Sequence, residues 1–84
     1  MSLNAETILE VVRSYVGQLN PKLAPKISME TRLLQDGYLD SFALVQLITE
    51  LEKVLDIQLG DGALLPEDFE SPAVLVERLN ELQD

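Results

Sequence analysis

The sequence predicts an all-α protein, a bundle of three main helices plus one short helix, with a long first loop between the first two helices. Three observations lead to this prediction. Apolar residues recur at helical spacing in three segments of the 84-residue chain, capping residues precede these segments, and no segment shows sustained alternation of apolar and polar residues. Because 46% of the residues are hydrophobic, one small core and a single domain over residues 1–84 are expected.

The first helix is predicted between Asn4, an N-cap residue, and Asn20-Pro21, which closes the pattern. Its apolar stripe consists of Ile8, Val11, Val12, Tyr15, Val16 and Leu19. The connection at residues 20–39 holds two prolines and a glycine but keeps enough apolar residues to be predicted to lie over the core. Its length predicts that the first two main helices run roughly parallel, because an antiparallel pair needs only a short turn.

The second helix has the clearest pattern and is predicted from Asp40 or Ser41 to about Leu55. Its apolar stripe consists of Leu44, Leu47, Ile48, Leu51 and Leu55. The segment Leu59-Gly60-Asp61-Gly62 then breaks the helical pattern, because glycine disfavours a helix.

The rest of the chain predicts a short helical turn at Pro66-Glu67-Asp68-Phe69 and a last helix after Ser71, an N-cap that is followed by proline at the first helical position. The inner side of the last helix is formed by Val74, Leu75, Leu79 and Leu82. The residues expected to matter most for folding are Val12, Leu47, Leu51 and Leu75.

Composition excludes several classes of function. The chain has no cysteine and no histidine, which excludes disulfides, metal sites built on sulfur or imidazole, and nucleophilic catalysis of the Cys-His or Ser-His kind. Its net charge of −9 is concentrated in residues 36–84, which carry twelve acids and two bases, whereas residues 1–35 carry three acids and four bases. Such a field disfavours nucleic acid and anionic membranes, and it favours basic protein surfaces or serves solubility alone. With neither a leader nor a membrane-spanning run, a cytoplasmic monomer without a metal site is expected.

Asp40 and Ser41 are both good capping residues, yet the second helix needs only one N-cap. Asp40 suffices, because its carboxylate accepts an amide hydrogen bond and places a negative charge at the positive end of the helix. Ser41 is then the first helical residue, and its hydroxyl is free to project from the helix end. From the dipeptide alone, a purely structural role is the simpler interpretation.

A longer pattern surrounds this dipeptide. It consists of Thr31-x-Leu33, Gly37, Leu39-Asp40-Ser41-Phe42, Leu44-Val45-x-Leu47 and the later Pro66-Glu67-Asp68-Phe69-x-Ser71. The pattern resembles that of the acyl and peptidyl carrier protein family, the phosphopantetheine-binding domains, and the resemblance covers nearly the whole chain. It implies an acyl-carrier-protein-like four-helix bundle.

The resemblance implies that Ser41 is esterified through its hydroxyl to 4'-phosphopantetheine by a separate phosphopantetheinyl transferase that uses coenzyme A. The arm then carries an acyl or aminoacyl group as a thioester, which an activating ligase loads and which an acyltransferase or synthase receives. The carrier itself is not an enzyme. The partner-binding residues that the resemblance implies are Asp40, Phe42, Val45 and Glu52. Phe42 and Val45 could instead be buried, because apolar residues at helical spacing usually pack inside.

Some positions depart from the fatty-acid members of the family. Ala43 and Gln46 stand where many of those carriers have acidic residues, and Phe42 replaces the commoner leucine. Two residues separate Gly37 from Asp40, where the fatty-acid type has one. This spacing, together with Val45-Gln46-Leu47, resembles that of free-standing aminoacyl and D-alanyl carrier proteins. The departures favour a specialised, discrete carrier in lipid biosynthesis or secondary metabolism over service in general fatty acid synthesis.

Two other hypotheses remain open from the sequence. A helical adapter of the same fold would bind a partner helix and never be modified, and it would not need a serine at position 41. An enzyme would have to use carboxylates alone, for example Asp36 and Asp40, for general acid-base catalysis. Gly37 makes that stretch a loop, which disfavours a paired carboxylate site.

Overall fold

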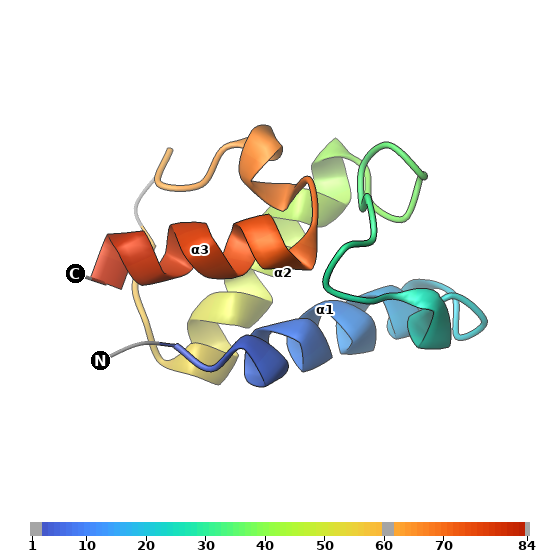
Figure 1. Cartoon of the computed structure of the whole chain (residues 1–84), viewed down its shortest axis with the longest axis horizontal. Coiled ribbons are helices and arrows are strands. Elements are labelled where there is room, and N and C mark those ends of the chain that lie inside the picture. The colour runs from blue at the N-terminus through green and yellow to red at the C-terminus, as the bar shows by residue number, and fades with distance from the viewer. Residues whose placement is uncertain (1–2, 60–61, 84) are drawn as a thin grey trace.

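The computed structural model describes residues 3–59 and 62–83, and within these ranges it is all-helical with no strand. The described ranges contain three α-helices and two short 3-10 turns, and Figure 1 shows how they are arranged. In chain order they are α1 (Ala5–Leu19), η1 (Ala24–Lys26), α2 (Ser41–Leu55), η2 (Pro66–Phe69) and α3 (Pro72–Gln83). The prediction of three main helices plus one short helix is confirmed, and the additional turn η1 lies in the long connection.

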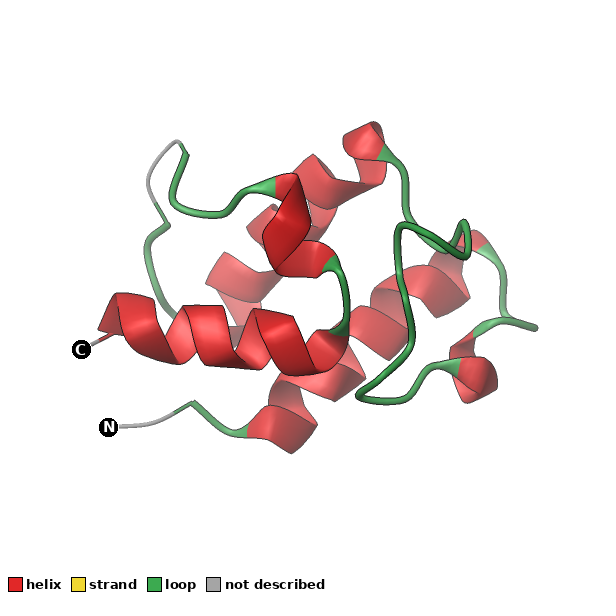
Figure 2. Cartoon of the chain, turned by 45° about the horizontal axis from the view of Figure 1, so that its top comes forward, coloured by secondary structure: helices red, strands yellow, loops and turns green. Residues whose placement is uncertain are grey.

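The helices form a bundle in which α1 contacts both α2 and α3, while η2 contacts both α2 and α3 from the other side. Figures 1 and 2 show α1 running against the direction of α2 and α3, so that both chain ends lie at the same end of the bundle. The prediction that the first two main helices run parallel is therefore wrong. The long connection does not span the bundle, because its length is used to cover the core at one end.

Side-chain caps fix where two of the helices begin. The Asn4 side-chain oxygen accepts hydrogen bonds from the amides of Glu6 (2.8 Å) and Thr7 (3.4 Å), which confirms Asn4 as the N-cap of α1. The Ser71 hydroxyl accepts a hydrogen bond from the amide of Val74 (3.3 Å) at the start of α3. Polar residues with short side chains therefore set the predicted helix boundaries by satisfying first-turn amides.

One apolar core joins the three helices, the connection and η2. Its buried members are Ile8, Val11, Val12, Tyr15, Val16, Ile27, Leu33, Leu39, Ala43, Leu44, Leu47, Leu51, Leu64, Phe69, Leu75 and Leu79. The four residues expected to matter most, Val12, Leu47, Leu51 and Leu75, are all buried, so that prediction is confirmed. Leu19 is assigned to the apolar stripe of the first helix but does not belong to this core. It is 60% exposed at the last position of α1, where the helix extends past the core.

The connection between α1 and α2 is held against the core as the sequence predicts. Ile27, Leu33 and Leu39 are buried, and the amide of Leu39 donates a hydrogen bond to the Leu33 carbonyl (3.0 Å). The Leu33 amide donates to the carbonyl of Glu70 (3.0 Å), which ties the connection to the end of η2. Arg13 of α1 also donates its Nε proton to the Ile27 carbonyl (2.9 Å). These bonds satisfy backbone groups that the absence of regular structure would otherwise leave unpaired.

A residue in the left-handed conformation ends α2. Asp56 has φ 53°, and the amides of Asp56 and Ile57 both donate to the carbonyl of Glu52. Gly62 also has a positive φ, 79°, whereas Gly60 and Asp61 of the predicted helix-breaking segment lie outside the described residues. Within the described part of the chain, no helix is long and apolar enough to cross a membrane.

Candidate functional site

The start of α2 separates the roles of Asp40 and Ser41. Asp40 has extended backbone angles, and its Oδ1 accepts a hydrogen bond from the amide of Ala43 (2.8 Å), so Asp40 is the N-cap. Ser41 is the first residue of the helix and is exposed, and its hydroxyl makes no hydrogen bond to any described residue. The prediction that Asp40 alone caps the helix is confirmed, and the Ser41 hydroxyl has no structural bond to maintain.

Ser41 lies at the edge of a small apolar recess between α2 and the segment that contains η2. The recess has a volume of about 160 Å³. Its other lining residues are Leu44, Val45, Ile48, Leu64, Leu65, Pro66 and Phe69. A second recess of about 260 Å³ shares Val45, Ile48 and Leu64 with the first and extends toward Leu59. The two recesses therefore follow each other along α2 from Ser41, and the second is also lined by Thr49 and Glu52.

Three large apolar side chains are exposed around Ser41. Phe42 is 73% exposed, Val45 is 63% exposed, and Leu65, across the recess, is 46% exposed. We call these three residues the apolar patch. The interpretation that Phe42 and Val45 pack inside is wrong, because the residues of α2 that face the core are Ala43, Leu44, Leu47 and Leu51. Exposed apolar groups gathered on one face are typical of a surface that another molecule covers.

The predicted partner-binding residue Glu52 lies in a different environment. Its side chain is half-buried, and its Oε2 accepts a hydrogen bond from the amide of Leu59 (2.9 Å). The same residue's carbonyl accepts the bonds that close α2. Glu52 therefore holds the turn after α2, and the structure places it away from the first turn where Asp40 and Phe42 lie.

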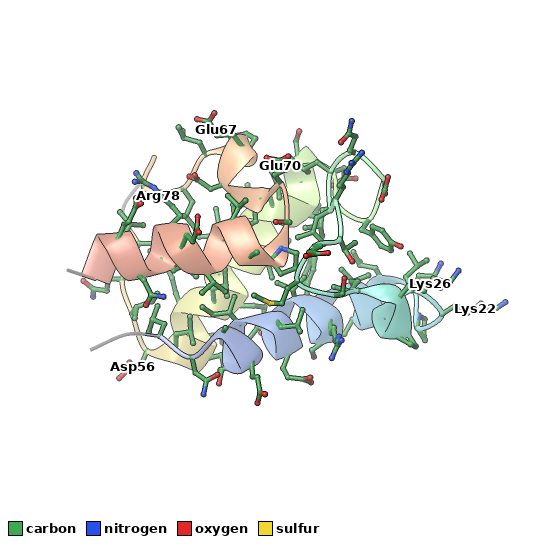
Figure 3. The ribbon with its side chains drawn as sticks, in the orientation of Figure 1. Lys22, Lys26, Asp56, Glu67, Glu70 and Arg78 are labelled. Atoms are coloured by element: carbon green, nitrogen blue, oxygen red, sulfur yellow. The ribbon has the colours of Figure 1, made fainter. Side chains whose placement is uncertain are left out.

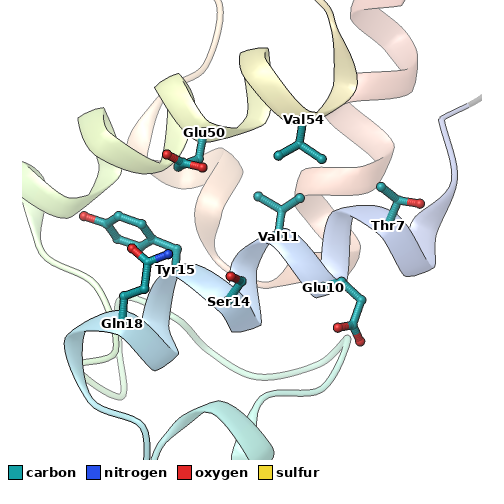
Figure 4. A pocket seen from close by; sticks show the side chains of 8 residues that line it. All are labelled: Thr7, Glu10, Val11, Ser14, Tyr15, Gln18, Glu50 and Val54. Carbon is teal, nitrogen blue, oxygen red and sulfur yellow. The ribbon is translucent and has the colours of Figure 1, made fainter.

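A larger groove lies between α1 and α2 (Figure 4). It has a volume of about 300 Å³ and is lined by Thr7, Glu10, Val11, Ser14, Tyr15, Gln18, Glu50 and Val54. Burial raises the pKa of the Tyr15 phenol, and the negative charges of Asp40 and Glu50 raise it further. Sequence periodicity assigns Tyr15 to the core, and the influence of the two carboxylates on its pKa is a consequence of the antiparallel packing of α1 and α2.

The described residues do not activate the Ser41 hydroxyl as a nucleophile. A serine hydroxyl is a weak nucleophile unless a base activates it, and the chain has no histidine. The nearest carboxylate in sequence is that of Asp40, and it already accepts the hydrogen bond from the Ala43 amide that caps α2. Among residues 3–59 and 62–83, no three His, Cys, Asp or Glu side chains gather in a group that could hold a metal ion. Ser41 therefore presents an exposed hydroxyl without an activating base or a metal group among the described residues.

The structure brings to Ser41 several residues that sequence reasoning did not assign to the site. Leu64, Leu65 and Pro66 follow Ser41 by more than twenty positions, yet they line the same recess. Their only sequence signal is a pair of leucines outside any helical pattern, directly before a proline. Such a pair indicates a buried or contacting loop, but it does not say which helix the loop contacts.

The described part of the chain is a small helical bundle that presents an exposed serine at the start of α2. Known proteins with a related sequence are carrier proteins. The chain is similar to D-alanyl carrier proteins from Bacillus cereus and Bacillus anthracis, with 29% identity over 58 residues, which cover 69% of this chain and 73% of each relative. The predicted resemblance to free-standing carrier proteins is therefore confirmed, as a distant relationship.

No family model matches the sequence. No solved structure matches it.

Proposed function

We propose that the protein carries an acyl or aminoacyl group as a thioester on a 4'-phosphopantetheine arm attached to the Ser41 hydroxyl. The observation that carries this proposal is the division of roles at the start of α2, where Asp40 caps the helix and Ser41 is exposed without a hydrogen-bond partner among the described residues. The similarity to D-alanyl carrier proteins supports it.

The residues around Ser41 suit a phosphodiester. The amides of Ser41 and Phe42 donate hydrogen bonds to no described residue, and they lie at the N-terminus of a 15-residue helix, where the positive end of the helix dipole favours an anion. The apolar recess beside Ser41 offers a surface along which an arm can lie. When attached, the arm would supply the thiol that a cysteine-free chain lacks.

The attachment requires a separate enzyme. In the proposed reaction, the Ser41 oxygen forms a bond to the phosphorus of coenzyme A that carries the pantetheine, and adenosine 3',5'-bisphosphate leaves. The hydroxyl proton passes to a base of the phosphopantetheinyl transferase, because this chain provides no activated base at Ser41. On this proposal the protein performs no catalysis itself and acts in the cytoplasm as a substrate for successive partners.

The relatives narrow the proposed cargo and partners. Because their name specifies a D-alanyl group, we propose that the cargo is a small amino acid, loaded by an adenylating ligase and passed to an acyltransferase. Asp40, Phe42 and Val45 would form the part of the docking surface next to Ser41. Glu52 would act there indirectly, by holding the turn after α2.

Intact-mass measurement tests the proposal. The protein is incubated with coenzyme A, magnesium and a broad-specificity phosphopantetheinyl transferase, and Ser41→Ala is the matched control. The expected result is a mass gain of one phosphopantetheine for the wild type and none for the variant. If the folded wild type gains nothing while a known carrier is modified in parallel, the proposal fails.

The exposed apolar patch also suits a second candidate, an unmodified adapter of the same fold that binds a partner through Phe42, Val45 and Leu65. The two candidate functions differ in the role of the Ser41 hydroxyl oxygen. An adapter would bind its partner equally well after Ser41→Ala, whereas a carrier would lose its function.

A further inference from the structure

We propose that the groove between α1 and α2 is a second binding site, and that it takes an arginine side chain of a protein partner while Ser41 stays free. The inference goes beyond the proposed function, because it needs neither Ser41 nor an attached arm. It rests on the shape of the groove, on one buried residue whose hydroxyl has no partner, and on one half-buried carboxylate that has no cation.

The groove and Ser41 lie on opposite sides of α2. Ser41 and Glu50 are nine positions apart, about two and a half turns at 3.6 residues per turn, so their side chains point in opposite directions. The segment that contains η2 bounds the recess at Ser41, whereas α1 bounds the groove. The buried residues Leu47 and Leu51 lie between the two. A ligand in the groove therefore does not cover Ser41.

The groove has an apolar middle and a polar end. Figure 4 shows Val11 of α1 and Val54 of α2 facing each other across the middle. Glu50, Tyr15 and Gln18 lie at one end of it. The volume of about 300 Å³ is at the lower limit of ligand sites, so the groove suits one long side chain better than a larger organic molecule.

Tyr15 presents a hydroxyl that the fold does not use. The residue is only 8% exposed, and its phenol oxygen forms no hydrogen bond with any described residue, although a buried tyrosine usually pairs this group. Every fully buried polar side-chain atom of the described residues has a partner, so the Tyr15 oxygen must reach the surface of the groove. It is therefore available to accept a hydrogen bond from an N–H group of a ligand.

Glu50 adds a negative charge beside this hydroxyl. Its side chain is half-buried and forms no ion pair with the residues that the structure describes. Lys53, three positions further along α2, is exposed and does not pair with it. A carboxylate that is partly removed from water without a counter-ion costs free energy, and a cation in the groove would recover part of that cost.

The cations of the neighbouring elements are directed elsewhere. Arg13 of α1 bonds to the carboxylate of Glu10 (3.3 Å) and to the carbonyl of Ile27 (2.9 Å). Figure 3 shows Lys22 and Lys26 pointing away from the bundle. The polar end of the groove therefore keeps a negative charge that the described residues do not neutralise.

This negative field also acts on the phenol, because burial, and then the charges of Asp40 and Glu50, raise the pKa of Tyr15. An arginine side chain matches all of these features. Its planar guanidinium donates N–H groups to a carboxylate and a phenol oxygen and stacks on an aromatic ring. Its aliphatic stem covers apolar surface such as Val11 and Val54. A lysine ammonium is more strongly hydrated and loses more on entering a groove of this kind.

The test is a titration of the unmodified protein, followed by NMR of its backbone amides, with Nα-acetyl-arginine amide as the probe. Saturable shifts are expected at Val11, Tyr15 and Glu50, and none at Ser41 or Val45. Nα-acetyl-citrulline amide has the same length but a neutral urea group, and it should bind at least about tenfold more weakly.

Two variants test the polar end of the groove. Glu50→Gln should raise the Kd of the probe about five- to tenfold, and Tyr15→Phe about two- to threefold, because each removes an acceptor. Glu77→Gln is the matched control, since it removes an exposed carboxylate of α3 and should change the Kd less than about twofold. Circular dichroism melts check that the variants are folded, and Tyr15→Phe keeps the buried ring.

Equal binding of the arginine and citrulline derivatives, an unchanged Kd in Glu50→Gln, or shifts centred on Ser41 would overturn the inference. Tighter binding of Nα-acetyl-lysine amide would overturn the choice of a guanidinium. Tighter binding of free arginine, whose own carboxylate the groove should repel, would overturn the assignment to a partner's side chain. None of these results depends on modification of Ser41, so the mass measurement tests the proposed function separately.

Discussion

Along α2, Leu44, Leu47 and Leu51 face the core and are buried, whereas Phe42 and Val45 on the same helix face solvent. Both sets are apolar, and by composition they are interchangeable. The buried set contacts α1 and the rest of the core, and its removal from water drives folding. The exposed set lies beside Ser41 and gains little from folding, and its apolar character suits the contact with a partner that we propose. The comparison teaches that the apolar residues of one helix divide between a face that drives folding and a face that is left for other contacts.

The largest expected effect is a difference in the free energy of unfolding between variants of the buried face and variants of the exposed face of α2. Leu51→Ala should lower the free energy of unfolding by about 2–5 kcal/mol, because Leu51 is fully buried and its truncation leaves a cavity. Phe42→Ala should change it by less than about 0.5 kcal/mol, because the ring is already in water. Urea denaturation measures both. Equal losses for the two variants would show that the faces are not distinct.

The next effect separates the two residues at the start of the helix. Asp40→Ala should cost about 1 kcal/mol of stability, because the Ala43 amide loses its hydrogen bond and the helix end loses a favourable charge. Ser41→Ala should stay within about 0.5 kcal/mol of the wild type, because its hydroxyl bonds to no described residue and alanine favours a helix. Thermal melts followed by circular dichroism check the order. A larger loss for Ser41→Ala would assign the capping role to the serine.

A gain in stability is expected at the other end of α2. Asp56 adopts the left-handed conformation, φ 53°, and it places a negative charge at the negative end of the helix dipole. Asp56→Gly should raise the free energy of unfolding by about 0.5–1 kcal/mol, because glycine adopts this conformation without strain. Asp56→Asn is the control, since it removes the charge and keeps the side chain. A destabilised Asp56→Gly in chemical denaturation would contradict this account of the cap.

The smallest effect concerns the face of α2 that contacts α1. Burial, and then Asp40 and Glu50, raise the pKa of Tyr15, so its phenol should ionise at a pH above the ordinary value of about 10. A folded-state pKa above the unfolded one gives a stability contribution that is fully present below pH 10 and is lost as the pH rises through the folded pKa. Absorbance titration of the Tyr38→Phe variant isolates Tyr15, because the chain has two tyrosines.

Two further variants sharpen this titration. Asp40→Asn should lower the Tyr15 pKa only slightly, because burial is the larger cause. Tyr15→Phe should remove the extra loss of stability above pH 10. A phenol in Tyr38→Phe that titrates at or below the ordinary pKa would contradict the burial of Tyr15 against α2.

Much of the fold could be predicted from the sequence because local rules decide it. Asn4 and Ser71 indicate where two helices start, because their side chains can cap first-turn amides. The periodic leucines of residues 44–55 indicate the buried face of α2. The direction of α1 relative to α2 could not be predicted from the length of the connection. That length is used for packing Ile27, Leu33 and Leu39 against the core, and periodicity says nothing about the path of a loop.

The candidate site also has features that follow from the sequence and features that follow only from the packing of the whole chain. Ser41 and its separation from the cap follow from the order Asp40-Ser41, because a helix needs one N-cap and the next residue is then the first of the helix. The recess beside Ser41 does not follow from local order. Leu65 and Pro66 line it together with Ser41, because Phe69 is buried and Asp68 contacts Arg78.

The sequence by itself determined the helices, their caps, the buried stripe of α2 and the serine at its start. Each of these depends on contacts between residues a few positions apart, so their spacing in the chain carries the information. The tertiary structure alone decided that Phe42 and Val45 are exposed, that Glu52 holds a turn, and that Leu65 and Pro66 line the recess at Ser41. These features depend on which surfaces the other helices cover, and that is fixed only when the whole chain packs around one core.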